Sequence, residues 1–173
     1  MEILRLATEW AKAEVFSARF FIFFAILFLS ASIGFWQLGK TEMAKAYIMP
    51  TFVAGLLILA VGVGIFFANK SRVTSFAEAY HTSPSGFVKS EISRTEKSMG
   101  EYNTIVFKII PFVIIAAALL IVFVDKPLWR AISITTIAMM MVILLVDSNA
   151  NARIKAYKKQ LELAGKKEFN GLN

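Results

Sequence analysis

Four long apolar blocks constrain this chain more than any other feature of its sequence. The blocks cover residues 20–39, 46–69, 105–124 and 127–146. A helix of about 20 residues crosses the roughly 30 Å hydrocarbon core of a bilayer, so each block is long enough to span one. The only charged residues within them, Lys108 and Arg130, lie near block ends, where long side chains reach the membrane surface. The sequence therefore predicts an all-α integral membrane protein with four transmembrane helices.

The connections between the blocks indicate how the helices pair. Residues 40–45 join the first two blocks, and the turn VDKPLW at 124–129 joins the last two, with Pro127 suited to the first turn of a helix. Connections this short make consecutive helices antiparallel neighbours. We therefore expect a four-helix bundle made of two antiparallel transmembrane hairpins.

The first block is interpreted as a retained span and not as a cleaved signal peptide. Its apolar run is longer than the about 7–15 residues typical of signal peptides, and the preceding segment holds as many acidic as basic residues. Residues 1–173 are accordingly treated as a single membrane domain. Each half of the chain repeats the order amphipathic segment, span, turn, span, but no residue-level identity supports an internal duplication.

Lysine and arginine residues gather on one side of the predicted membrane. They are frequent in segments 1–19, 70–104 and 147–173, whereas the opposite side holds only Lys40, Lys45, Lys126 and Arg130. Trp36, Tyr47 and Trp129 lie at that opposite side, as in an aromatic belt. The positive-inside rule then places both termini in the cytoplasm, and the expected location is a bacterial inner (plasma) membrane.

The three cytoplasmic segments are predicted to be helical and amphipathic. Residues 1–19 repeat apolar side chains at helical spacing and suit a helix lying at the headgroup boundary. Residues 70–104 break at HTSPSG and then restart, with Pro84 as a first helical residue. The second part runs without interruption into the third span, so we expect one continuous helix from residue 84 to 124. Residues 147–173 form a basic tail.

Two apolar stripes on these segments are the candidate cytoplasmic interface. Their residues are Val88, Ile92, Met99, Tyr102, Ile154, Tyr157 and Leu161. Spacings of four and three residues are typical of a helical packing seam. We expect the two stripes to pack on each other or on neighbouring subunits, and the charges between Val88 and Tyr102 to form the water-facing side of a helical stalk.

The net charge of +7 indicates a partner with negative charge. The candidate lipid-headgroup ligands are Lys155, Lys158, Lys159, Lys166 and Lys167. Each basic residue near an anionic membrane surface contributes about 1 kcal/mol of attraction. A bilayer with anionic headgroups is therefore the expected partner, and no nucleic-acid motif accompanies the basic residues.

Small residues in the first two spans favour close helix packing. The candidate packing or oligomer residues are Ser30, Gly34, Ala60, Gly64 and Ala68. Small side chains four residues apart let two helices approach closely in a membrane. We expect contact within one subunit as their first use and self-association as the second.

Residues that carry chemistry are scarce. The chain has no cysteine and one histidine, His81, which is interpreted as an exposed loop residue. Asp147, Asn151 and Arg153 suggest either an ion or headgroup site or an interface boundary with local hydrogen bonds. Spans without ionisable residues in their centres disfavour ion-coupled antiport. We predict no catalytic residue, no metal site and no cofactor.

These features leave three hypotheses for function. The first is a non-enzymatic membrane subunit whose cytoplasmic helices bind a protein partner in an accessory, immunity or assembly role. The second is a small homo-oligomeric ion channel or pore, suggested by hydroxyl side chains in the spans. The third is a membrane-shaping protein.

Overall fold

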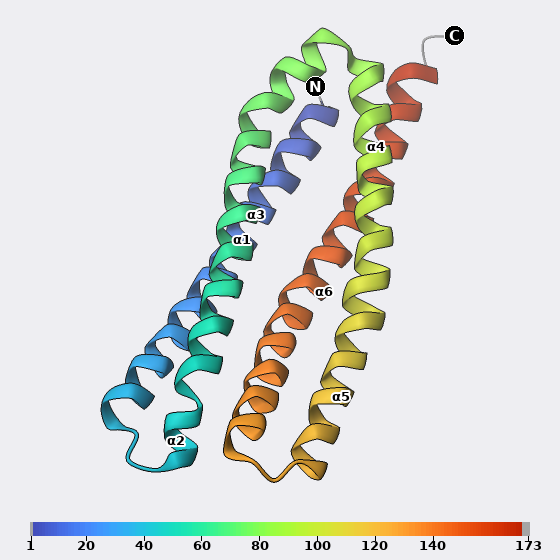
Figure 1. Cartoon of the computed structure of the whole chain (residues 1–173). Coiled ribbons are helices and arrows are strands. Elements are labelled where there is room, and N and C mark those ends of the chain that lie inside the picture. Colours follow the sequence, from blue (N-terminus) through green and yellow to red (C-terminus); the bar gives the residue numbers. More distant parts are fainter. Residues whose placement is uncertain (1, 171–173) are drawn as a thin grey trace.

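The computed structural model describes residues 2–170, and every regular element within that range is helical (Figure 1). The elements are α1 (Glu2–Leu38), α2 (Glu42–Ala46), α3 (Ile48–Thr82), α4 (Pro84–Glu101), the π-helix η1 (Tyr102–Ile109), α5 (Ile110–Phe123) and α6 (Pro127–Asn170). Four helical stretches are long and apolar enough to cross a membrane, as the sequence predicts. Met1 and residues 171–173, which belong to the expected N-terminal segment and tail, lie outside the described residues.

Local sequence explains where these helices begin and end. Thr41 caps α2 by accepting a hydrogen bond from the Ala44 backbone NH at 3.1 Å. Ser83 has an extended backbone (φ −154°, ψ 90°), which separates α3 from α4, and Pro84 then starts α4. Pro127 starts α6 in the same way after a three-residue break at 124–126. The stretch from Pro84 to Phe123 is helical throughout, as expected, but it passes through the π-helix η1 on the way.

The helices lie side by side along one long axis, and the two ends of the chain lie at the same end of the molecule (Figure 1). α1 and α3 run beside each other, joined at the far end through α2, and α6 packs on α1. α5 continues η1 without a break, packs on α6 and lies at the edge of the arrangement. Ile110 and Ala117 are the two buried residues of α5.

The buried apolar residues form two separate clusters, which follow one another along the long axis of the molecule. We call residues 2–19, 70–104 and 147–170 the polar half, and residues 20–69 and 105–146 the apolar half. The core of the polar half contains Ile3, Ala7, Trp10, Ala11, Phe76, Tyr80, Phe87, Val88, Ile154, Tyr157, Leu161 and Ala164. The core of the apolar half contains Phe21, Ala25, Ile58 and Val146. The polar half is thus a four-helix bundle with its own core, formed by the ends of α1, α3 and α6 together with α4.

The N-terminal segment differs from its sequence expectation. Residues 2–19 do not form a separate surface helix but continue directly into the first apolar block as one helix. Ile3 and Ala7 are fully buried in the core of the polar half, to which α3, α4 and α6 also contribute residues. The apolar face of an amphipathic helix can be buried either against other helices or against a bilayer surface. In this structure it is buried against other helices.

The close contact between α1 and α3 depends on glycines other than the predicted ones. A Cβ atom at Gly62 would lie 2.8 Å from Phe21 Cβ, and one at Gly55 would lie 2.8 Å from Leu29 Cγ. Ala60, Gly64 and Ala68 instead lie on the exposed face of α3, and a Cβ atom at Gly64 would meet nothing within 4 Å. Ser30 is exposed, and Gly34 is partly buried with open space beside it. This stripe therefore lies on another face of α3 than the contact with α1, and its use in packing or self-association stays a prediction.

Candidate functional site

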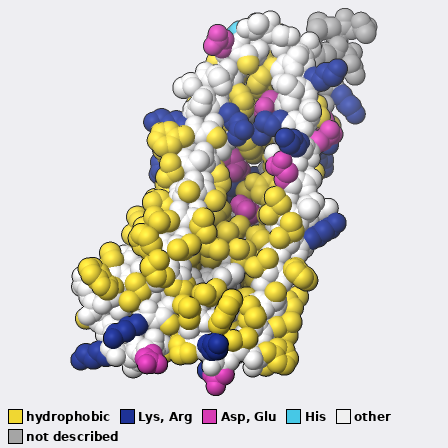
Figure 2. All heavy atoms as spheres, in the orientation of Figure 1, with side chains coloured by type: hydrophobic (Ala, Val, Ile, Leu, Met, Phe, Trp, Pro, Cys, Tyr) yellow, Lys and Arg dark blue, Asp and Glu magenta, His cyan; other side chains and the backbone are white. Residues whose placement is uncertain are grey.

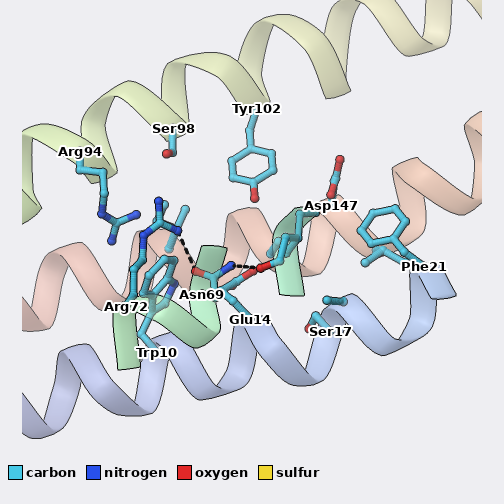
Figure 3. A pocket seen from close by; sticks show the side chains of 15 residues that line it. Trp10, Glu14, Ser17, Phe21, Asn69, Arg72, Arg94, Ser98, Tyr102 and Asp147 are labelled. Atoms are coloured by element: carbon cyan, nitrogen blue, oxygen red, sulfur yellow. Dashed lines mark hydrogen bonds between the residues drawn. The ribbon is translucent and has the colours of Figure 1, made fainter. Parts of the chain in front are cut away.

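A polar cavity of about 150 Å³ lies between the two cores, where α1, α3, α4, η1 and α6 meet. Its polar lining residues are Trp10, Glu14, Ser17, Asn69, Arg72, Arg94, Ser98, Tyr102 and Asp147 (Figure 3). Figure 2 shows a hollow in the surface between α3 and α4, with acidic and basic side chains around it and a broad hydrophobic surface below it. The cavity is therefore at the level where charged surface gives way to apolar surface.

Arg94 and Trp10 line the cavity, and an ion pair and a stacked ring behind them hold these two side chains in place. Arg94 donates two hydrogen bonds to the Glu91 carboxylate, at 2.8 and 2.7 Å. The Tyr157 hydroxyl donates a third to the same carboxylate at 2.9 Å. Trp10 stacks on Tyr157 with ring centroids 5.2 Å apart, and the Arg94 guanidinium lies 4.3 Å from the Trp10 ring centroid. Bidentate hydrogen bonds of this kind hold the Arg94 side chain in one position.

A second ion pair crosses the molecule behind the cavity. Arg153 Nε donates to Glu14 Oε1 at 3.1 Å and joins residues that lie 139 positions apart in the sequence. Burial raises the pKa of the Glu14 carboxyl, although the hydrogen bond from Arg153 opposes that change. The ion pair thus connects Arg153 of α6 to α1, whereas the sequence pattern suggested only a local cluster of Arg153 with Asp147 and Asn151. The Asn151 side-chain oxygen is buried and has no hydrogen-bond partner among the described residues.

Arg72 and Asp147 differ from these paired groups. Arg72 donates a hydrogen bond to Asn69 at 2.8 Å, and no carboxylate within residues 2–167 lies at ion-pair distance from it. Burial, followed by repulsion from Arg94, lowers the pKa of Arg72. Asp147 has neither a hydrogen bond nor an ion pair with any residue that the structure describes. Burial, followed by repulsion from Glu14, raises the pKa of Asp147 to about 6.

Several other polar groups of the lining have no intramolecular partner within the described chain. The Trp10 Nε1 atom is buried and donates to nothing. The hydroxyls of Ser17, Ser98 and Tyr102 have no hydrogen bond to another described residue. Burial, with the nearby charges of Glu14 and Asp147, raises the pKa of the Tyr102 hydroxyl and keeps it protonated. Buried polar groups are nearly always hydrogen-bonded. A cluster of polar groups without partners therefore marks a site that holds water or a ligand.

The cavity has an apolar floor. Phe21, Ile65 and Val146 close its lower end and belong to, or pack against, the core of the apolar half. Two hydroxyls further down are used for packing: Ser32 donates across to the Ile48 backbone oxygen at 2.8 Å, and Thr51 donates back to Tyr47 at 2.7 Å. The polar lining therefore ends where the apolar half begins.

The predicted interface residues lie together, but inside the molecule. Val88, Ile154, Tyr157 and Leu161 are buried in the core of the polar half. Ile92, Met99 and Tyr102 are partly buried against the same core. The apolar stripes of α4 and α6 therefore pack on each other within the chain, which is one of the two arrangements that the sequence left open.

The predicted headgroup lysines lie along the outer end of α6. Lys155, Lys159, Lys166 and Lys167 are exposed, whereas Lys158 forms ion pairs with Glu96 at 2.8 Å and Glu162 at 3.4 Å. α6 runs through this region as one helix. Lys166 is therefore about 30 Å beyond Val146 along the helix, at a rise of about 1.5 Å per residue. That distance exceeds the roughly 10 Å over which charges interact with a surface in physiological salt.

Sequence reasoning missed the inward-facing charges. Glu14 and Glu91 are only 6% and 5% exposed, and Arg72 and Arg94 are partly buried. The expectation that the charges between Val88 and Tyr102 face water is wrong for Glu91 and Arg94. One signal was present: Glu91 and Arg94 stand three residues apart next to the apolar stripe, as do Asn69 and Arg72, which allows local pairing on an inner face.

His81 is exposed in the last turn of α3, with its ring against Tyr80. No group of three or more histidine, cysteine or acidic residues that could hold a metal ion occurs among the described residues. No protein-family model, curated protein or solved structure matches the chain.

Proposed function

We propose that this chain is an integral membrane protein whose apolar half spans the bilayer as two antiparallel transmembrane hairpins. Three observations support the proposal. The apolar half exposes large side chains, for example Phe112 at 71% and Phe123 at 80%. Charged residues bound this hydrophobic band at both ends (Figure 2). The excess of lysine and arginine in the polar half favours a cytoplasmic location for it, and so for both termini, in a plasma membrane of the bacterial inner-membrane type.

Within that frame, the function that the geometry supports best is non-enzymatic binding of a small charged ligand by the polar half. One observation carries this proposal: the cavity is lined by charged and polar groups that the chain itself leaves without partners. Leaving such groups unsatisfied costs about 1–3 kcal/mol each. A fold retains this cost where the groups serve a ligand. The protein would then act as a binding subunit at the cytoplasmic surface of the membrane.

The test is ligand-dependent stabilisation of the purified protein in nanodiscs, measured as the midpoint of thermal unfolding. A panel of small anions, cations, zwitterions and neutral polyols is added one at a time. A ligand at 100 times its Kd adds about 2.7 kcal/mol to the free energy of unfolding and raises the midpoint by several degrees. The variant Ser98→Leu fills the cavity from α4 and should abolish the shift. Ser93→Leu, on the exposed face of the same helix, should retain it.

If no class of molecule raises the midpoint, or if Ser98→Leu responds as the wild type does, the ligand-binding proposal is wrong. The same measurement without ligand shows whether each variant is folded. Because Ser98 makes no hydrogen bond with the rest of the described chain, its replacement removes no native contact.

A second candidate function is docking of a protein partner on α6, which one observation favours. Lys155, Lys159 and Lys166 are exposed and form no ion pair with any described residue. Lys166, about 30 Å beyond Val146 along α6, is too far from lipid headgroups and suits an acidic protein surface better. The expected partner therefore binds the outer face of the polar half, since the predicted stripes are already packed within the chain.

This candidate is tested on the native particle, extracted gently without overexpression. A second polypeptide in fixed ratio should co-purify, and Lys155→Glu with Lys159→Glu and Lys166→Glu should release it. Lys70→Glu, an exposed lysine on α3, is the control. A particle that contains this chain alone contradicts the docking proposal. A ring-sized multiple of 19.3 kDa would instead favour the homo-oligomeric channel, whose path would have to form between copies because the cavity has an apolar floor.

A further inference from the structure

Two of the charges around the cavity, of opposite sign, form no ion pair with a described side chain. Among the charged residues near it, Glu91 is paired with Arg94 and Glu14 with Arg153. Arg72 and Asp147 remain, and neither has an oppositely charged partner within residues 2–167. Figure 3 shows Arg72 beside Arg94 at one end of the cavity and Asp147 beside Tyr102 at the other. The cavity therefore has one positive and one negative end.

We propose that the cavity binds a small zwitterion, with its anionic group at Arg72 and its cationic group at Asp147. The inference rests on the ligand-binding function proposed above and specifies the chemical class of the ligand. A simple anion would leave the Asp147 carboxylate uncompensated, and a simple cation would do the same to Arg72. Charges removed from water are stable only when they are paired, so a molecule that carries both signs satisfies the cavity best.

Uncharged groups at the positive end point to the same arrangement. The Trp10 Nε1 atom can only donate a hydrogen bond, it is buried, and it lines the cavity near Arg72 (Figure 3). The Arg72 guanidinium keeps further NH groups after its single bond to Asn69. Donor groups that have no hydrogen-bond acceptor among the described side chains are suited to the oxygen atoms of a carboxylate or a phosphate.

The negative end offers the complementary set. The Asp147 carboxylate accepts from no described residue, and the Tyr102 hydroxyl and the Ser17 hydroxyl lie on either side of it without partners of their own (Figure 3). Carboxylate and hydroxyl oxygens together accept the NH groups of an ammonium ion. Tyr102 begins the π-helix η1, and single π-helical turns occur often at functional sites because they redirect a side chain.

Size limits the ligand to a few non-hydrogen atoms between the two charges. The cavity of about 150 Å³ has room for several water-sized groups. An amino acid, a betaine or a phosphoethanolamine group fits that space. The hollow opens between α3 and α4 just above the apolar surface (Figure 2). The zwitterion can therefore be a free solute from the cytoplasm or the headgroup of a phospholipid whose chains lie on the apolar half.

The experiment measures binding by isothermal titration and by the thermal midpoint, with the protein in nanodiscs of anionic phosphatidylglycerol. The soluble probes are phosphoethanolamine, inorganic phosphate, ethanolamine and glycine. A short-chain phosphatidylethanolamine is the lipid probe, and short-chain phosphatidylglycerol is its matched control. We expect phosphoethanolamine or glycine to bind at least about 10-fold more tightly than phosphate or ethanolamine. Binding of the short-chain phosphatidylethanolamine alone identifies the lipid as the source and also supports the proposal.

Two variants separate the ends of the ligand. Asp147→Asn should weaken binding of the zwitterion at least about 10-fold without weakening binding of phosphate, because a repelling carboxylate is removed. Arg72→Gln should weaken both. Asp125→Asn, an exposed acid at the opposite end of the molecule, should change neither. Asp147→Asn removes an unpaired charge, so it should fold at least as well as the wild type.

The outcomes distinguish this inference from the function on which it rests. If phosphate alone binds as tightly as phosphoethanolamine, and Asp147→Asn changes nothing, the cavity binds anions and the zwitterion proposal is overturned while ligand binding stands. If none of these probes binds but a neutral polyol does, the zwitterion proposal is likewise overturned. If no compound of any class binds, both proposals fall.

Discussion

The polar half and the apolar half of this molecule are built on the same helices but are held together differently. The core of the polar half combines large apolar side chains with the buried ion pair of Glu91 and Arg94 and a hydrogen bond from Tyr157. The apolar half has a smaller buried apolar cluster, with four buried residues, and α1 and α3 approach closely there at Gly55 and Gly62. α5 remains largely exposed in that half.

The difference follows from the solvent that we infer for each half. In water, burial of apolar area drives helices together at about 25 cal/mol per Å². In lipid that drive is absent between helices, so association depends on close packing at small residues. The comparison teaches that one chain can meet both requirements by changing the side chains along a helix without changing the helix. α1, α3 and α6 each pass through both regions.

Among the variants that test this comparison, we expect Glu91→Ala to lower the stability most. Glu91→Ala leaves the Arg94 guanidinium buried without its carboxylate and removes the acceptor of the Tyr157 hydroxyl. Breaking a buried pair on one side costs about 3–5 kcal/mol. We expect a corresponding fall in the thermal midpoint of the protein in detergent. Glu101→Ala, an exposed acid at the end of the same helix, should stay near the wild type. Equal midpoints for both variants would mean that the polar half does not depend on this ion pair.

The next effect is expected in the apolar half at Gly62. Gly62→Val places a side chain where a Cβ atom alone would already lie 2.8 Å from Phe21, so α1 and α3 must separate. Overpacking of this kind costs about 1–3 kcal/mol. Gly64→Val is matched in helix propensity and meets nothing within 4 Å. We therefore expect a lower midpoint for the first variant only. A fall for Gly64→Val alone would show instead that the exposed stripe of α3 is an interface between copies.

A smaller effect, of a few degrees in midpoint, is expected from the pH dependence at Asp147. Burial raises its pKa to about 6 from an ordinary value of 3.8. The folded state then binds a proton more tightly than the unfolded state, so the free energy of unfolding is highest below pH about 4, falls up to pH about 6 and is constant above. Glu14 on α1 has a raised pKa too and faces Asp147, together with Tyr102, Arg72 and Arg94 from the other walls of the cavity.

Asp147→Asn should therefore reduce the decline of the midpoint between pH 4 and 6 without abolishing it, because Glu14 still contributes. The measurement is thermal unfolding across that range in both proteins without ligand. A midpoint that rises with pH in the wild type, and equally in the variant, would contradict the position of Asp147 in the cavity.

The smallest effect is expected at Lys158. Its ammonium contacts Glu96 and Glu162 at the surface, and the contact with Glu96 raises its pKa. Ion pairs exposed to water contribute little and are weakened by salt. Lys158→Met should shift the thermal midpoint by no more than about 2–4 °C, measured with and without 1 M salt. A large loss would mean that the outer surface, and not the core, holds α4 to α6.

The sequence predicted what depends on runs and periods of residue type. The four apolar stretches and the break before Pro84 were accessible in this way, because length and spacing alone decide them, whereas spacing left two possible partners for the apolar stripes. The cavity was not. Glu14 and Arg153 meet across 139 positions, and no local pattern indicates that contact. The position of Gly62, and not Gly64, at the helix contact depends on the rotation of α3 about its axis. A single π-helical stretch or a small change in crossing angle sets such a rotation.

The most direct test of the account asks which surfaces of the two halves meet water and on which side of the membrane. The chain has no cysteine, so single cysteines placed at Ser93, Ile115 and Thr41 can be labelled with a membrane-impermeant maleimide in sealed vesicles of known orientation. All three positions are exposed in the structure. We predict that Ser93→Cys reacts only from the cytoplasmic face, Thr41→Cys only from the opposite face, and Ile115→Cys from neither. Reaction of Ile115→Cys from either face, or of Ser93→Cys and Thr41→Cys from the same face, would contradict a water-exposed polar half joined to a membrane-spanning apolar half.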